Sequence, residues 1–384
     1  MIKFSNARLW DGVADGQSAG DIFVRDGLIA EGDAGTPCDS VRDLGGLFVI
    51  PGLIDAHVHL CLNPAVRDPL AQSLPEDAIL LGEMRERALA MLRAGITSAR
   101  DLGGGAHLEL WIRDEIREGL LPGPRLLCAG QPVTSPGGHC HFWGGEAASV
   151  EEALSVVERQ RSHGVDLIKI MATGGNITPG SKPVDSQFDD ETLQQVVSRA
   201  GQYSYHVAAH CHGTNGIRQA TLAGVQTIEH CSWVGENGWG RGFDPSVVAQ
   251  MSSRNLWVSP TINSGWRRFQ DEAFVEMVRG NYDRMKAAGI RLIASTDAGI
   301  PNIYHDDLPR ALPEFARFAG LSPVEVLKTA TSECAEAIGL GKIAGRIKAG
   351  YSADFVAYDR NPLEDLGVLE NPVMVVARGE EIAL

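Results

Sequence analysis

The feature that most limits the possible folds of this chain is a regular alternation of short apolar segments with longer amphipathic ones. The short segments have the length and the β-branched content of buried strands. They span residues 53–59, 96–102, 125–129, 165–172, 205–211, 225–230, 256–262 and 291–296. The amphipathic segments span residues 76–93, 107–118, 150–163, 189–200, 213–222, 245–253, 271–288, 308–318 and 322–338. Strands that are joined by helices pair in parallel, so we predict an α/β fold.

The number of strands selects the architecture within this class. Eight strands, each followed by a helix, close as a (β/α)8 TIM barrel, and 384 residues suffice for that barrel and a smaller domain. A doubly wound open sheet is the alternative, but no G-x-G-x-x-G or P-loop sequence follows a strand. Glycines such as Gly164 and Gly224 stand where helix C-caps are expected. We therefore predict a barrel over residues 56–341.

The two ends of the chain predict a second, smaller domain. Residues 1–46 contain short alternating strands, and Asp26-Gly27 between two apolar runs is a hairpin signal. The C-terminal segments 353–359 and 373–379 have the same character. Neither end has enough apolar surface to fold alone. We therefore expect residues 1–55 and 342–384 to form one small β-sandwich domain.

Charge and cysteine content argue against several classes of function. The formal net charge is -15 without a long basic run, which argues against nucleic acid or an anionic membrane as a partner. No apolar stretch has the length of a transmembrane helix, and the first residues lack the apolar core of a signal peptide. The seven cysteines are scattered without a C-x-x-C pair, as in reduced cytoplasmic proteins. We expect a cytoplasmic homo-oligomer that acts on a small molecule.

The strand over residues 53–59 carries the first chemical signal. It contains Asp55, His57 and His59, and side chains at i and i+2 of a strand share a face, so the two imidazoles converge on one point. Histidine nitrogens are common zinc ligands. A His-x-His pair alone is equally well explained by two incidental histidines in a buried strand.

The later strands end in groups of the same kind. The polar residues at these ends are Lys169, His210, His212, His230 and Asp297. In a barrel these ends form the active-site face, so the pattern predicts a nitrogen and oxygen site for zinc or a similar divalent ion. The alternatives are a buried lysine paired with a carboxylate, ordinary core histidines, and a helix N-cap at Asp297.

Together these motifs resemble the amidohydrolase superfamily, and most of all its imidazolonepropionase-like branch, which includes Xaa-Pro dipeptidases and carboxypeptidase-like enzymes. The matching stretches are residues 52–59, 168–175, 210–213, 228–230, 296–299 and 345–359. The resemblance extends over nearly the whole chain, because these stretches are spread from its N-terminal part to its C-terminal part. Each motif is weak alone, and the combination is specific.

The resemblance implies a binuclear metal centre. Its ligands would be His57, His59 and Asp297 on one ion, His210 and His230 on the second, and Lys169 between them. Lys169 would be carboxylated by carbon dioxide, because an ammonium group cannot bind a cation and a desolvated lysine is nucleophilic. His212 is interpreted as a residue behind the ligands, not as a ligand.

The loops after the strands supply the predicted substrate contacts. By similarity to the family, His139 would polarise the substrate carbonyl or contact a carboxylate. His141 either binds substrate or faces solvent. Gly174 and Gly175 would let the backbone approach the substrate closely, and His305 would line the pocket.

One position departs from the family pattern. Peptidases of this branch tend to carry a tyrosine shortly after the histidine of the sixth strand, where it helps to hold the α-carboxylate of the substrate. Here the residue is Trp233, whose indole is a large group that can only donate a hydrogen bond. With Trp143, Trp239 and Trp266 in loops at the same face, it favours an apolar or aromatic substrate group over a free-carboxylate dipeptide. Arg267 and Arg268 either bind an anionic group or form a solvated pair.

Three functions remain open on the sequence. The leading hypothesis is a metal-dependent amidohydrolase in which a hydroxide that bridges two metal ions attacks an amide-type carbonyl. Asp297 would be the general base and then the general acid. The second is a mononuclear deaminase or imidazolonepropionase-like hydrolase of a cyclic amide, which needs no Lys169 ligand. The third is a non-catalytic barrel scaffold.

Overall fold

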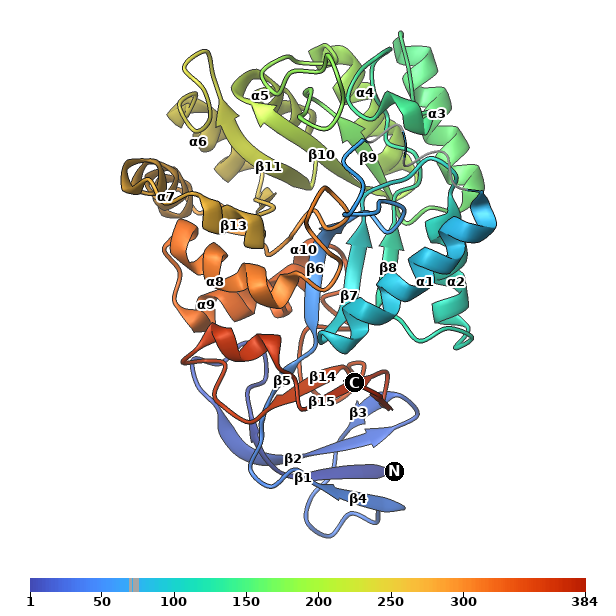
Figure 1. The fold of residues 1–384 in the computed structure, drawn as a ribbon, viewed down its shortest axis with the longest axis vertical. Coiled ribbons are helices and arrows are strands. Elements are labelled where there is room, and N and C mark those ends of the chain that lie inside the picture. The colour runs from blue at the N-terminus through green and yellow to red at the C-terminus, as the bar shows by residue number, and fades with distance from the viewer. Residues whose placement is uncertain (69–70, 72–75) are drawn as a thin grey trace.

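The computed structural model describes residues 1–68, 71 and 76–384. Its larger part is an α/β body, which lies above a smaller sheet in Figure 1. The strands of the body are β6 (Leu53–Val58), β7 (Ile96–Asp101), β8 (Arg125–Cys128), β9 (Leu167–Met171), β10 (His206–Gly213), β11 (Thr227–Val234), β12 (Trp257–Ser259) and β13 (Arg291–Leu292). The α-helices are α1 (Asp77–Arg93), α2 (Leu108–Arg117), α3 (Val150–His163), α4 (Asp190–Gln202), α5 (Thr214–Ala223), α6 (Pro245–Ser253), α7 (Glu272–Ala287), α8 (Leu308–Ala319), α9 (Pro323–Thr329) and α10 (Ser332–Ala337).

All strands of the body pair in parallel, in the orders β6-β7-β8 and β13-β12-β11-β10-β9. Backbone hydrogen bonds of the segments that follow β6, β8 and β13 also link the two sheets. Val133 N donates to Lys169 O at 2.9 Å on one side. On the other side, His59 N donates to Ala298 O at 2.8 Å. The predicted α/β class with parallel strands is confirmed.

The helix ends follow the local sequence. The side chain of Ser149 accepts a hydrogen bond from Glu152 N at the start of α3, and Asp189 does the same for Thr192 N at the start of α4. Gly164 ends α3 with a φ of 76°, a left-handed conformation that glycine adopts without steric cost. These caps stop each helix where the chain must turn back toward the next strand.

Both halves of the terminal sheet come from distant parts of the sequence. Its strands are β1 (Ile2–Leu9), β2 (Ser18–Arg25), β3 (Leu28–Ala30), β4 (Ser40–Asp43), β5 (Phe48–Pro51), β14 (Phe355–Tyr358), β15 (Met374–Ala377) and β16 (Glu380–Ile382). Strand β5 pairs with β1 on one edge and with β14 on the other. The strands form one continuous sheet, with Phe4, Val49 and Phe355 among its buried residues. The exact domain boundaries and the two-layer sandwich stay predictions.

Several elements differ from the sequence-based expectation. The strand predicted over residues 291–296 is only Arg291–Leu292, and the strand predicted over 225–230 is Thr227–Val234. Two further differences have a clear cause in the backbone. The helix predicted over residues 322–338 is two helices, α9 and α10, because Thr331 has φ -137° and ψ -99°, which no α-helix accepts. The strand predicted over 256–262 ends at Ser259, since Thr261 has a left-handed φ of 54°. The body retains the predicted order of elements in spite of these differences.

Two general features bear on the cellular setting. Among the described residues, no helix combines the length and the apolarity that crossing a bilayer requires. All seven cysteines are free thiols.

A buried carboxyl group near the start of α2 gives a test of stability against pH. Glu109 is 1% exposed, and its Oε1 has no hydrogen-bond partner among the described residues. Burial, with a smaller contribution from Asp101, raises the pKa of Glu109 to about 8. The unfolded chain releases this proton near the ordinary glutamate pKa, so stability falls as pH rises from about 4.5 to 8.

We expect Glu109→Gln to remove this loss. Chemical denaturation at pH 5 and at pH 8 should show a variant that gains about 3–4 kcal/mol relative to wild type at the higher pH. Glu118→Gln, at an exposed position just past the same helix, is the control and should gain nothing. Equal pH dependence in Glu109→Gln and wild type would contradict the assignment.

Candidate active site

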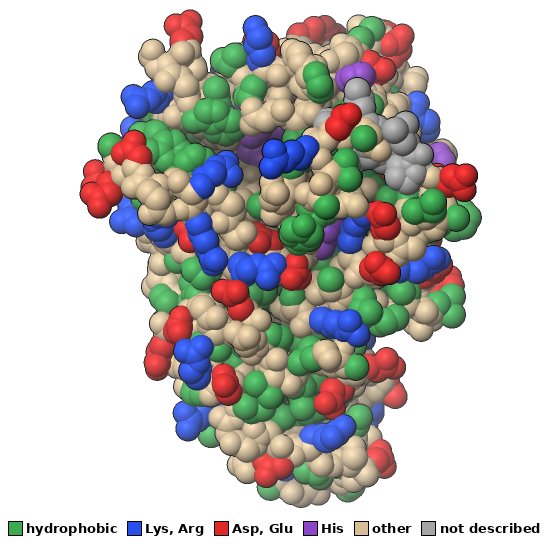
Figure 2. Space-filling view, viewed as in Figure 1, with side chains coloured by type: hydrophobic (Ala, Val, Ile, Leu, Met, Phe, Trp, Pro, Cys, Tyr) green, Lys and Arg blue, Asp and Glu red, His purple; other side chains and the backbone are tan. Residues whose placement is uncertain are grey.

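A cavity of about 450 Å³ opens where several parallel strands of the body end. In the upper half of Figure 2, histidine side chains are visible in a hollow that hydrophobic and basic side chains border. The polar residues in its wall include His57, His59, His139, Lys169, His210, His212, His230 and Asp297. The structure therefore brings all six predicted metal ligands to one cavity, and their role as ligands stays a prediction.

The first cluster in this cavity is formed by His57, His59 and Asp297. His57 Nδ1 donates to Glu229 Oε2 at 3.0 Å, and His59 Nδ1 donates to Gly103 O at 2.9 Å, so each Nε2 carries a lone pair. These two Nε2 atoms lie 3.2 Å apart. Asp297 Oδ1 lies 3.3 Å from the first and 3.4 Å from the second.

Three electron-rich atoms at this spacing repel one another unless a cation lies among them. Burial lowers the pKa of His57 to about 4, so this imidazole is neutral near pH 7 and does not supply the positive charge itself. Neutral imidazole nitrogens with a carboxylate oxygen are a donor set for zinc and similar ions. The residues present therefore fit a divalent metal ion.

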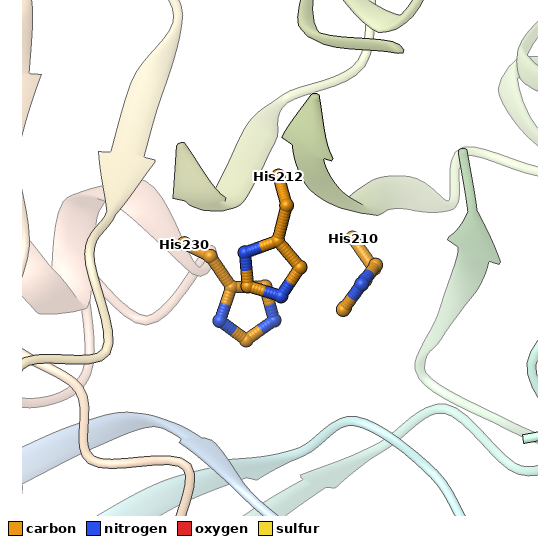
Figure 3. Close-up of side chains that lie close together, drawn as sticks. All are labelled: His210, His212 and His230. Carbon is orange, nitrogen blue, oxygen red and sulfur yellow. The ribbon is translucent and has the colours of Figure 1, made fainter. Parts of the chain in front are cut away.

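The second cluster is formed by His210, His212 and His230, which point toward one another from β10 and β11 (Figure 3). One ligand atom of each lies within 4.8 Å of one ligand atom of the others. His210 Nε2 donates to Gly174 O at 3.0 Å, which leaves its Nδ1 with a lone pair. His230 Nδ1 lies 2.8 Å from Thr261 Oγ1. The sequence interpretation set His212 behind the ligands, whereas its ring lies within the cluster and makes it a further candidate ligand.

Two of the predicted ligands have a strained backbone conformation. His230 has a φ of 65° and Asp297 a φ of 62°, both in the left-handed region that non-glycine residues seldom adopt. In an extended strand, consecutive side chains point to opposite faces, yet Glu229 and His230 both reach the site. The left-handed turn at His230 makes this possible, at a cost of about 1–3 kcal/mol.

Lys169 is a buried lysine without a partner. Its side chain is 1% exposed, and no hydrogen bond or ion pair joins its ammonium group to any residue that the structure describes. Burial lowers the pKa of Lys169 to about 8. The neighbouring carboxylates contact other groups, Glu229 through Arg100 and Asp297 through the histidines of β6. The alternative of a lysine paired with a carboxylate is therefore not observed.

Asp297 is not a helix cap either. The next helix, α8, begins at Leu308, and the residue at its N-cap position is Asp307. The Oδ2 atom of Asp297 has no hydrogen bond with any described residue, and the carboxylate lines the cavity. The structure thus removes the helix-cap alternative.

Behind the first cluster, Arg100 and Glu229 form a buried ion pair that sequence reasoning missed. Arg100 Nη2 lies 2.8 Å from Glu229 Oε1, and Arg100 Nε donates to Ala56 O at 2.7 Å. Glu229 therefore fixes both the proton and the ring orientation of His57, as a carboxylate behind a metal-binding histidine does. The signals were an arginine inside an apolar strand and a glutamate directly before a predicted ligand.

This arrangement predicts that Glu229→Gln weakens metal binding. The amide cannot accept the His57 proton as strongly, and Arg100 loses its counter-charge, so we expect about 10–100-fold lower metal affinity. Titration of the metal-free protein with zinc measures the change. Glu115→Gln is the matched control, because Glu115 also pairs with an arginine, Arg85 at 2.6 Å, but on the outside of the body. Unchanged zinc affinity in a folded Glu229→Gln protein would refute the role.

Two predicted substrate contacts are better explained by packing around the histidines. His139 is buried with its ring centroid 4.5 Å from that of His210, and its Nδ1 has no partner in the described part of the chain. A Cβ on Gly175 would lie 2.4 Å from His139 Cε1, so Gly175 makes room for that ring. Gly174 supplies the carbonyl for His210, and a Cβ there would lie 2.3 Å from Lys182 O. Neither glycine is in the cavity wall.

Three other predicted contacts also lie outside the cavity wall. Trp233 is 2% exposed and donates from Nε1 to Met285 Sδ at 3.3 Å, because its left-handed φ of 50° turns it into the core. His305 Nε2 donates to His59 O at 3.0 Å and so holds the backbone of a predicted ligand. His141 begins the short helix η2 (His141–Trp143) beside Phe142. The cavity wall instead contains Trp239 and Trp266.

Comparisons with known proteins agree with the geometry. The sequence model of the amidohydrolase family matches residues 48–382. Ochratoxinase from Aspergillus niger is 27% identical over 363 residues, which cover 85% of this chain and 73% of that protein. Imidazolonepropionase from Chromobacterium violaceum is 22% identical over 381 residues, which cover 88% of this chain and 84% of that protein.

A solved structure shows the same fold. The crystal structure of a Xaa-Pro dipeptidase with bound methionine in its active site aligns with a TM-score of 0.84 and 25% identity, over 99% of both chains. The resemblance inferred from the motifs is thereby confirmed. Because the family model matches most of the sequence, from the start of β5 to the end of β16, the chain belongs to the amidohydrolase family.

Proposed function

We propose that this protein is a metal-dependent hydrolase that cleaves an amide-type carbon–nitrogen bond in a small molecule. The observation that carries the proposal is the convergence of two imidazole lone pairs and a carboxylate oxygen at 3.2 to 3.4 Å. The relatives named as an imidazolonepropionase and a Xaa-Pro dipeptidase support hydrolysis of carbon–nitrogen bonds. The apolar side chains in the same cavity support an organic substrate.

The two clusters would hold two divalent ions, in our proposal zinc. His57, His59 and Asp297 would be ligands of one ion, and the histidines of β10 and β11 would be ligands of the other. Lys169 would contribute as a carbamate, which the lowered pKa of its amine and the lack of a partner for its ammonium group among the described residues support. Ions in such a site polarise a carbonyl group and make water acidic enough to react near neutral pH.

The protein's own groups supply proton transfer and orientation. Asp297 keeps one carboxylate oxygen toward the histidines, and its other oxygen accepts a proton from the attacking water and returns it to the leaving nitrogen. Burial lowers the pKa of His139 to about 3, so His139 acts as a neutral hydrogen-bonding group toward the substrate carbonyl.

We also propose how the two parallel sheets and the terminal sheet are organised into domains. We take the two parallel sheets as one closed (β/α)8 barrel over residues 56–341, with residues 1–55 and 342–384 as the second domain. The backbone hydrogen bonds that link the segment after β8 with β9, and β6 with the segment after β13, support closure. The pairing of β5 with β14 supports a domain built from both ends of the sequence.

Metal analysis of the purified protein tests the proposal. We expect about two divalent ions per chain, and removal of the ions with a chelator should abolish hydrolysis. One ion per chain with full activity would favour the mononuclear deaminase or ring-opening reaction. No bound metal would favour the scaffold. A panel of dipeptides, N-acyl amino acids, cyclic amides and aryl amides is the activity screen.

A further inference from the structure

The outer part of the cavity is built from aromatic side chains. We call Trp239, Trp266, Phe269 and Phe274 the aromatic wall. Phe269 lies between two of the others, with ring centroids 5.6 Å from Trp266 and 4.9 Å from Phe274. Trp239 reaches the metal-binding end, where its ring centroid lies 4.9 Å from that of His212. An apolar group held by the wall is therefore adjacent to the proposed reaction site.

Part of the aromatic wall has empty space behind it. A second cavity of about 30 Å³ is lined by Trp239, Trp266 and Phe274 together with Tyr282 from α7. These three rings thus have free volume on two sides. Side chains that are not packed tightly on their far side can shift to fit rings of different size. This arrangement suits bulky apolar groups better than one fixed shape.

A cation without a carboxylate partner among the described residues lies beside the aromatic wall. Arg268 lines the cavity, its guanidinium lies 4.5 Å from the ring centroid of Phe269, and its Nη1 donates to Gly265 O at 3.2 Å. Among the described residues, no carboxylate pairs with Arg268. The neighbouring Arg267 instead pairs with Glu314 at 3.3 Å. The two arginines of this short segment therefore differ, and Arg268 is the one available to a ligand.

The charges in the cavity wall favour an anionic ligand group at this place. Asp297 is the one carboxylate among the described residues that line the cavity, and it already faces the histidines of β6. A guanidinium group recognises a planar carboxylate through paired hydrogen bonds. The family pattern led us to doubt that the segment around Trp233 binds a substrate carboxylate. Arg268 lies in another segment, so that doubt does not apply to it.

We infer that Arg268 and the aromatic wall determine specificity, and that they select amides carrying an aromatic or bulky apolar group together with a carboxylate. The ring packs against Trp239, Trp266 and Phe274, and the carboxylate pairs with Arg268. The amide then lies toward the metal-binding histidines. This inference rests on the proposed function for the reaction, but the binding preference is independent of turnover.

Binding of three small probes to the metal-loaded protein tests the inference. The probes are 3-phenylpropionate, the uncharged 3-phenylpropanamide, and butyrate, which lacks the ring. By calorimetry, we expect 3-phenylpropionate to bind about fivefold tighter than 3-phenylpropanamide, as an exposed ion pair allows. It should bind about tenfold tighter than butyrate because the ring is buried.

Variants assign each preference to its residue. Arg268→Gln should lose the preference for charge and keep the preference for the ring. Arg267→Gln removes the same charge one residue away and should keep both. Trp239→Leu, at a position 38% exposed where the fold tolerates change, should lose most of the ring preference and keep the charge preference. A charge preference that survives in Arg268→Gln would mean that the carboxylate binds elsewhere, and would overturn the inference.

Two further outcomes also count against the inference: equal binding of all three probes, and no measurable binding of any. Hydrolysis gives a separate readout, in which N-acetylphenylalanine should exceed its methyl ester and N-acetylalanine in kcat/KM. If none of these amides is hydrolysed but the probe preferences follow the variants as stated, the proposed function fails and the specificity assignment stands.

Discussion

Replacing Asp297 with asparagine should reduce turnover by about 10²–10⁴-fold while much of the metal stays bound. Asparagine keeps one oxygen that can face His57 and His59, whose Nε2 atoms lie 3.3 and 3.4 Å from the present carboxylate. It cannot accept a proton in place of the second oxygen. Asparagine also tolerates the left-handed φ of 62° at this position, so the backbone should keep its path.

Steady-state kinetics and metal content on the same preparation check this expectation. Asp306→Asn is a suitable control, because Asp306 lies nearby in the sequence but pairs with Arg310 at 3.0 Å and does not line the cavity. The control should keep nearly all activity. Turnover of Asp297→Asn close to that of wild type would exclude Asp297 as the group that moves the proton.

Removal of Lys169 should have the second large effect, on the metal itself. We expect Lys169→Ala to lower metal affinity by at least about 100-fold, since even groups that only orient ligands contribute 10–100-fold. Short carboxylic acids such as acetate should restore part of the activity, because a carboxylate can stand where the carbamate stood. The lowered pKa of Lys169 and the lack of a partner for its ammonium group are the observations behind this expectation.

Two further variants distinguish loss of a metal ligand from damage to the fold. Lys169→Met fills the same buried volume without a charge, so a fold damaged by the cavity in Lys169→Ala would be intact in this second variant. Lys182→Ala changes an exposed lysine in the loop after the same strand and should leave metal content unaltered. Full metal content in both Lys169 variants would show that the residue is not a ligand.

The pairs of histidines could be predicted from the sequence because they obey strand geometry. His57 lies in β6 and His59 directly follows this strand, and the structure places their Nε2 atoms 3.2 Å apart, as side chains at i and i+2 of extended backbone allow. His210 and His212 show the same i and i+2 spacing, so the signal for His212 as a cavity residue was present. We nevertheless predicted His212 as a residue behind the ligands, because the family resemblance implies only one ligand, His210, from this strand.

Strand β11 shows why the orientation of the other site residues could not be predicted from the sequence. His230, Cys231 and Trp233 all have left-handed φ values, between 50° and 65°, which no alternation rule anticipates. The side chains of Glu229 and His230 therefore both reach the site, and Trp233 turns away from it. The ion pair of Arg100 with Glu229 joins β7 to β11, a distance along the sequence over which local patterns carry no information.

The position of β5 between two distant partners has a consequence for biosynthesis. This strand leads directly into β6 with its two histidines, and it pairs with β14 at Phe355–Tyr358. Residues 48–59 leave the ribosome long before residues 294–298 and 355–358, which complete the edges of these two strands. Until then the nascent chain exposes unpaired strand edges, which favour association between copies. If the proposed metal centre forms, it should therefore be loaded only after residues 294–298 and 355–358 have been synthesised.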